Sequence, residues 1–134
     1  MNEQTKPEVT IKKEDAVVYY INDPKHSYGV FCFNSSGDFF MNSDWGFYGY
    51  AWRAFAKDFK DFLAYTDPDY IFQKFANNMA YVYGKNLPRR KNLEPHVIEL
   101  IKIFQAELKR EISEAKADEA YNETRKDDFE QKQP

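Results

Sequence analysis

The chain has 134 residues, of which 43% are hydrophobic and 18% aromatic, and its 22 acidic and 19 basic residues give a formal net charge of −3. This aromatic content supplies enough apolar area to offset the ordering entropy of one domain, which excludes a chain that is disordered throughout. The nearly balanced charge excludes a global field that would draw the protein onto nucleic acid or an anionic membrane.

The single cysteine and the N-terminal residues bear on the cellular compartment. Cys32 cannot form an intramolecular disulfide, which is typical of a reducing compartment. Residues 1–13 are polar and charged and lack the apolar core of a secretory signal. No stretch approaches the roughly 18 apolar residues that a membrane span needs. We therefore expect a cytoplasmic protein without a membrane partner.

The first elements in the chain are short runs of strand-forming residues. These runs cover residues 16–21, 28–33, 38–42 and 47–52. Turn-forming residues separate them, such as Asn22, Pro24 and Gly37. Because a parallel pair needs a crossover of a dozen or more residues, the short spacings predict an antiparallel meander.

Beyond Arg53 the hydrophobic period changes from two towards 3.6, which predicts helices. We expect these over residues 57–65, residues 67–84 and a segment that starts at about 92–95 and continues past residue 112. Asp67 is a suitable cap, and Pro68 fits the first helical position. The predicted fold class is α+β, a four-stranded antiparallel meander followed by three helices packed on one face. The last helix is charged.

The last predicted helix has apolar residues at steps of three and four, from Val97 to Ile112. This apolar seam could pack on its own sheet or against a second copy, so the oligomeric state stays open. We divide the chain into a disordered N-terminus at 1–8, a single α+β domain at 9–113, and a charged tail at 114–134. The tail is expected to fray or to be disordered because its apolar residues are few.

Residues suited to metal binding or catalysis are few and scattered. His26, His96 and Cys32 lack the close ligand spacing of a zinc site, so no metal or cofactor is expected. Cys32 fits a small core residue, and a pairing with either histidine has no supporting motif. Asp38 and Asp44 could suggest a hydrolase, but turn chemistry explains both. We therefore do not expect an enzyme.

The fourth strand offers the most distinctive pattern of aromatic residues. Alternate residues of a strand face opposite sides, so one set is Phe47, Gly49 and Ala51 and the other is Tyr48, Tyr50 and Trp52. If the first set lies under the helices, the second forms an exposed row of rings that could bind a protein or stack nucleobases. The alternative is that both faces are covered.

A basic loop gives an alternative function. Its cationic residues are Lys85, Arg89, Arg90 and Lys91. They could contact phosphate in RNA or single-stranded DNA, although a solvated loop between helices explains them as well.

Residues 37–75 contain motifs that the chain shares with a known group. The motifs are Ser36-Gly37-Asp38, Asn42-Ser43-Asp44-Trp45-Gly46, Tyr50-Ala51-Trp52-Arg53, Phe62-Leu63 and Asp67-Pro68-Asp69-Tyr70. This pattern resembles small phage and prophage proteins of unsettled activity. The resemblance implies a mobile-element origin, and small phage proteins of this kind often block a host factor, as anti-CRISPR proteins do.

The expected function is therefore that of a phage-encoded inhibitor of a host defence factor, such as a CRISPR effector nuclease. We expect the partner to be a host protein or a ribonucleoprotein complex, with possible RNA contact. The predicted contact residues are Tyr48, Tyr50 and Trp52 on the sheet and Glu107, Glu111 and Glu114 on the last helix. The acidic residues could occupy a basic nucleic-acid channel by charge complementarity.

Overall fold

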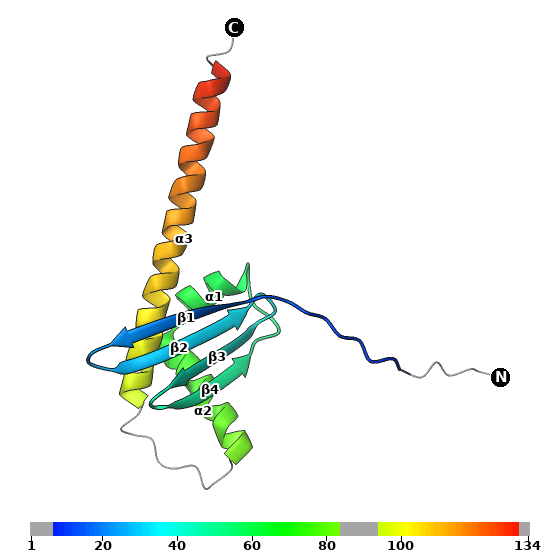
Figure 1. The fold of residues 1–134 in the computed structure, drawn as a ribbon, viewed down its shortest axis with the longest axis vertical. Coiled ribbons are helices and arrows are strands. Elements are labelled where there is room, and N and C mark those ends of the chain that lie inside the picture. The colour runs from blue at the N-terminus through cyan, green and yellow to red at the C-terminus, as the bar shows by residue number, and fades with distance from the viewer. Residues whose placement is uncertain (1–6, 84–93, 132–134) are drawn as a thin grey trace, which may run out of the picture.

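The first half of the chain folds into strands β1 (Ala16–Asp23), β2 (Ser27–Asn34), β3 (Asp38–Ser43) and β4 (Gly46–Ala51). The computed structural model describes residues 7–83 and 94–131. Each strand pairs antiparallel with the next, in the order β1-β2-β3-β4 (Figure 1). The predicted meander is confirmed, and each strand lies within two residues of its predicted bounds at either end.

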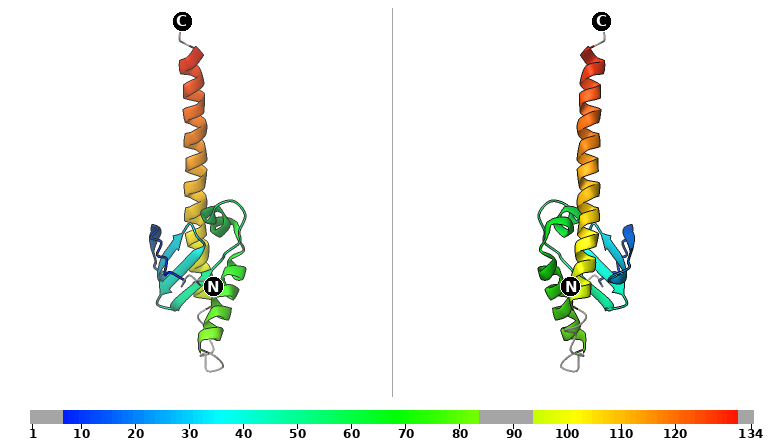
Figure 2. Two further views of the ribbon diagram at one scale, coloured as in Figure 1. Left: turned by 90° about the vertical axis from the view of Figure 1, so that its right-hand side faces the viewer. Right: turned by 90° about the vertical axis from the view of Figure 1, so that its left-hand side faces the viewer.

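Three helices follow the sheet and cover one of its faces (Figure 2). They are α1 (Phe59–Tyr65), α2 (Pro68–Tyr83) and α3 (Glu94–Gln131). Asp58 caps α1 by accepting a hydrogen bond of 2.8 Å from the Asp61 backbone N–H. The predicted α+β fold class, with a sheet first and three helices after it, is confirmed. In the described part of the chain, no helix has the length and apolar character that a membrane span requires.

The core lies between the sheet and the helices, and α3 contributes its centre. Phe104 of α3 is 1% exposed. Its ring stacks on Phe31 at a centroid distance of 4.5 Å and on Phe39 at 5.4 Å, and it meets Tyr19 edge-on at 5.4 Å. The apolar seam of α3 therefore packs on its own sheet, which is the first of the two alternatives that the sequence left open.

The turn between β2 and β3 is fixed against the end of β4. Gly37 has a φ of 102°, which side-chain-bearing residues rarely adopt. Its carbonyl accepts a hydrogen bond of 2.8 Å from the Trp52 backbone N–H. A Cβ added at Gly37 would lie 1.8 Å from the Trp52 carbonyl oxygen. The close approach of these two backbone segments therefore requires glycine.

The helix α3 continues well past the domain (Figures 1 and 2). Ile112 is buried, whereas residues 113–125 are all exposed. Helix continues through the predicted tail as far as Gln131. The predicted division at 1–8, 9–113 and 114–134, with a tail that frays or is disordered, stays a prediction.

Candidate binding surface

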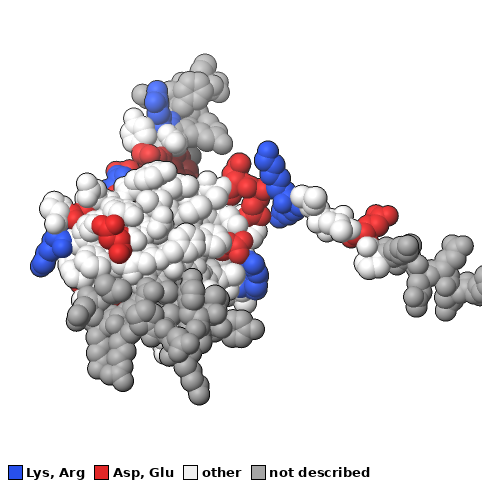
Figure 3. All heavy atoms as spheres, turned by 60° about the horizontal axis from the view of Figure 1, so that its bottom comes forward, with Lys and Arg blue, Asp and Glu red and all other residues white. Residues whose placement is uncertain are grey.

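The face of the sheet that the helices leave uncovered, which we call the outer face, is rich in large apolar side chains. Five of these side chains are substantially exposed: Val18 (45%), Tyr20 (80%), Tyr28 (39%), Phe40 (45%) and Phe47 (63%). They come from all four strands. Seen obliquely from the sheet side, the surface has a broad area without charged side chains, and its charged residues lie mostly around the margin (Figure 3).

The register of the sheet places four of these five side chains, all but Tyr28, in two rows across the strands. The first row is Val18, Cys32, Phe40 and Gly49, and the second is Tyr20, Val30, Asn42 and Phe47. A Cβ at Gly49 would lie 3.0 Å from the Phe40 ring, so the missing side chain leaves room for that ring. The two rows form one continuous surface because cross-strand neighbours of a sheet lie about 5 Å apart.

The charged strand residue of the outer face, Asp38, lies at a corner and is paired. Its carboxylate accepts hydrogen bonds from Asn34 Nδ2 at 2.8 Å and from Arg53 at 2.9 Å. The bond from Asn34, together with the guanidinium of Arg53, holds the pKa of the Asp38 carboxyl below its usual value. The strand residues at the centre of the outer face are therefore uncharged, and its one strand carboxylate is neutralised at the edge.

The structure corrects the predicted face of β4. Tyr48 is 1% exposed and Trp52 is 6% exposed, because both pack under α1 and α2. Tyr48 also donates a hydrogen bond of 2.8 Å to the Trp45 carbonyl. Tyr50 is partly buried, edge-on to Trp52 at 4.6 Å. The predicted row of exposed rings is therefore wrong; the other set of residues, which includes Phe47, faces outwards.

The predicted acidic residues of α3 are bound to other groups of the protein. Arg110 binds Glu107 and Glu114, with N–O distances of 2.5 Å to each. Glu111 accepts hydrogen bonds from the Tyr19 hydroxyl at 2.6 Å and from Lys60 Nζ at 2.9 Å. These pairings neutralise much of the negative charge that the predicted contact with a basic channel would use.

Glu111 is a structural tie between three elements. Partial burial raises the pKa of its carboxyl, but the hydrogen bonds from Tyr19 and Lys60 outweigh this and leave that pKa below its usual value. Burial and the same bond to Glu111 strongly raise the pKa of the Tyr19 hydroxyl. Glu111 therefore joins α3 to β1 and α1 as a carboxylate.

The two histidines, which are far apart in the sequence, meet at one end of the sheet. His26 Nδ1 and His96 Nδ1 are 3.1 Å apart. One ring must donate and the other must accept, so the pair shares a single proton in this contact. Trp45 stacks on His96 at 4.1 Å, and its Nε1 donates to the His26 carbonyl at 2.8 Å. The contact joins the β1–β2 turn to α3, and no sequence pattern indicated it.

The remaining candidates for chemistry are not brought together. Asp38 starts β3 and Asp44 follows its end, roughly 20 Å away along the strand, where Asp44 accepts a hydrogen bond from Ser27. Cys32 lies half-buried on the outer face, which corrects its prediction as a core residue. Within residues 7–83 and 94–131, no three histidine, cysteine or acidic residues gather as they would to hold a metal ion.

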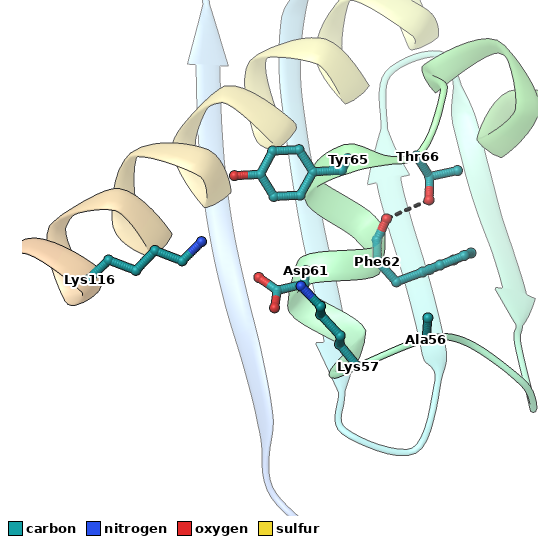
Figure 4. A pocket seen from close by; sticks show the side chains of 7 residues that line it. All are labelled: Ala56, Lys57, Asp61, Phe62, Tyr65, Thr66 and Lys116. Atoms are coloured by element: carbon teal, nitrogen blue, oxygen red, sulfur yellow. Dashed lines mark hydrogen bonds between the residues drawn. The ribbon is translucent and has the colours of Figure 1, made fainter. Parts of the chain in front are cut away.

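An open hollow between α1 and α3 also lacks an assembled catalytic group (Figure 4). It has a volume of about 310 Å³, and its charged lining residues are Lys57, Asp61 and Lys116. Among the described residues, no hydrogen bond or ion pair joins these three to one another. The Thr66 hydroxyl donates to the Phe62 carbonyl at 2.5 Å and closes the end of α1. The basic loop of Lys85, Arg89, Arg90 and Lys91 lies outside the described residues.

The fold and these surfaces define a small α+β protein with an open apolar sheet face. The chain belongs to the phage family Phage_phiTE_072, whose model matches residues 9–133. The resemblance to phage proteins is therefore confirmed, and it extends well beyond residues 37–75. No curated protein and no solved structure matches the chain.

Proposed function

We propose that this phage protein is a non-enzymatic binding protein whose outer face docks on an apolar surface of a host protein. The observation that carries the proposal is the set of five exposed large apolar side chains across four strands. A soluble antiparallel sheet with one free face normally presents polar residues there. Aromatic residues in an uncharged patch are also the side chains most often found at the centre of protein interfaces.

The size of the outer face sets a limit on the contact. Four strands about 4.8 Å apart and about six residues long give an area of roughly 400 Å². A standard interface buries about 800 Å² on each partner. The partner therefore also contacts residues around the outer face, where the exposed segment before β1 and the turns of the sheet lie.

In a finer version of the proposal, the partner is a host defence factor such as a CRISPR effector nuclease. A phage gains from a small protein that occupies a functional surface of such a factor without carrying out chemistry itself. In this version the outer face supplies the affinity by excluding water from its aromatic centre. Membership of a phage family fits this biology and leaves the partner to be identified.

The test compares capture of host proteins by three tagged forms of the chain. The double substitution Phe40→Ser and Phe47→Ser removes two outer-face rings, and we expect it to abolish capture of the specific partner. Tyr121→Ser is the matched control, because Tyr121 is 64% exposed on α3 whereas Phe47 is 63% exposed on the sheet. Circular dichroism checks that each variant is folded.

Two outcomes would contradict the proposal. Undiminished capture by the folded double variant would exclude the outer face. Capture that disappears after nuclease treatment would favour the nucleic-acid alternative.

The same forms are then expressed in a host with an active defence system and compared for phage plating efficiency. The wild type and Tyr121→Ser should restore plating and the double variant should not, if the partner is a defence factor.

A further inference from the structure

The strand β1 is a long edge strand without any of the features that usually block edge pairing. Among the residues that the structure describes, it pairs with β2 alone, and the pairing continues from Ala16–Asn34 to Asp23–Ser27 without a bulge. Its residues 16–22 include no charged residue and no proline. Natural sheets blunt such edges with lysine, proline, bulges or a covering segment, because an unpaired edge accepts another strand.

The opposite edge of the sheet is covered by contrast. The helix α2 packs along β4. Asn78 of that helix donates a hydrogen bond of 2.8 Å from its side chain to the Gly49 carbonyl. Lys74 of the same helix lies over the Tyr50 ring, 5.7 Å from its centroid. The two edges therefore differ in the way expected if only β1 is used for pairing.

A groove with space for an added strand lies beside β1. Its volume is about 520 Å³. Its lining residues are Tyr19, Tyr20 and Ile21 from β1 and Ile103, Ala106, Glu107 and Arg110 from α3. Val17, on the helix-facing side of β1, is 48% exposed, so the helix layer leaves this end of the strand uncovered. A strand added to β1 would cover Val17 and rest its side chains on the apolar part of α3.

We propose that the strand added to β1 comes from a second copy of this chain, which makes one continuous eight-stranded sheet. The sequence of β1 complements itself when two antiparallel copies are centred on Tyr19. Val17 then lies opposite Ile21 on the helix side, and Val18 lies opposite Tyr20 on the outer face. Pairs of β-branched with β-branched or aromatic residues are favourable cross-strand neighbours, and no like charges meet within residues 16–22.

The contact area is sufficient for a dimer. The seven paired residues, 16–22, extend over about 24 Å, and the sheet and helix layers together are about 20 Å deep. Each copy would therefore bury roughly 500 Å² and the pair about 1,000 Å², which is the lower limit for a specific interface. The symmetric contact is isologous, so it closes as a dimer and does not extend further. This proposal does not depend on the outer-face proposal.

The test measures molar mass by light scattering after size-exclusion chromatography, from low to high micromolar concentrations. We expect the wild type to shift from one copy to two as concentration rises. Val17→Lys places a charge in the paired edge and should remain monomeric while staying folded, because Val17 is half-exposed. Phe47→Lys makes the same kind of change on β4 and should still dimerise. A monomeric wild type, or unchanged dimerisation of Val17→Lys, would overturn the proposal.

A covalent cross-link tests the register independently of folding losses. Ala16 and Asn22 are exposed and become cross-strand neighbours only between two copies. Within one copy they are roughly 20 Å apart along β1, too far for a disulfide. In a Cys32→Ser background, the double variant Ala16→Cys and Asn22→Cys should form a covalent dimer under mild oxidation. Its failure to do so at a concentration where the wild type dimerises would refute the pairing centred on Tyr19.

Discussion

At the level of single residues, the tightest constraint is at Gly37, where the β2–β3 turn meets the end of β4. A Cβ there would lie 1.8 Å from a backbone oxygen of Trp52, and the backbone φ is 102°. We expect Gly37→Ala to lower stability by at least about 2 kcal/mol, since both the clash and the strain must be relieved. Thermal unfolding should show a melting temperature lower by roughly 5 °C or more.

Two further variants separate the causes of this loss. Asn tolerates positive φ better than Ala does, so Gly37→Asn would recover stability if backbone strain were the main cause. Because the clash is with backbone, we expect Gly37→Asn to be about as destabilising as Gly37→Ala. Ser35→Ala in the same turn is the control and should change little, since Ser35 is exposed. A stable Gly37→Ala variant would contradict the geometry of this turn.

Single residues also show what a sequence pattern can and cannot predict. The cap at Asp67 follows from residue type alone, and its side chain accepts a hydrogen bond of 2.9 Å from the Asp69 N–H. Gln105 gives no such signal, yet it is only 4% exposed. Its side chain donates to the Leu63 carbonyl at 2.9 Å and to the Thr66 carbonyl at the end of α1. A buried amide of this kind depends on tertiary contacts, which a helical period does not encode.

At the level of elements, Glu111 connects α3 with β1 and α1, and this connection depends on pH. Its pKa in the folded protein is below the usual value of about 4.3, so the unfolded chain binds the proton more tightly. The stability it contributes is present above about pH 4.3 and is lost as pH falls through the folded-state pKa. We expect Glu111→Gln to be less stable than the wild type near neutral pH, with a difference that shrinks on acidification.

The measurement is the melting temperature of both forms at pH values from about 7 down to about 3. Other carboxylates titrate in both proteins, so the difference between the two curves isolates Glu111. Glu123→Gln changes an exposed residue of the same helix and should leave the melting temperature unchanged at each pH. A difference between the wild type and Glu111→Gln that stays constant across this range would show that Glu111 acts by packing alone.

The arrangement of the elements was predictable where short-range patterns determine it, and the choice of face was not. Turn residues and the change of period located the strands and the helices. The alternation of residues in β4 correctly places Phe47 and Tyr48 on opposite faces of the sheet. It does not show which of the two faces is buried. That choice depends on the register with β3, where Gly49 accommodates the Phe40 ring on the outer side. The larger rings, Tyr48 and Trp52, then fill the core under the helices.

At the level of the whole molecule, the candidate surface could have been found from the strands that are apolar on both sides. Val17, Val18, Tyr19 and Tyr20 follow one another in β1, and Phe39, Phe40 and Met41 do so in β3. A sheet covered on one face normally alternates apolar with polar residues, whereas runs of this kind are typical of strands covered on both faces. The helices cover only one face, and within residues 7–83 and 94–131 no further layer covers the other.

The tail of α3 projects beyond the folded domain (Figure 1). From Ile112 to Gln131 the helix extends by about 28 Å, and residues 113–125 are all exposed. Deleting residues 118–134 removes none of the core residues that the structure describes, so we expect a melting temperature within about 2 °C of the wild type. The far-UV circular dichroism should lose helical signal, because the deleted part is helical to Gln131. A loss of several degrees would mean that the tail packs on the domain. Unchanged stability would mean that the tail does not contribute to folding. The family model nevertheless matches the chain as far as residue 133, so the tail is part of what the family shares.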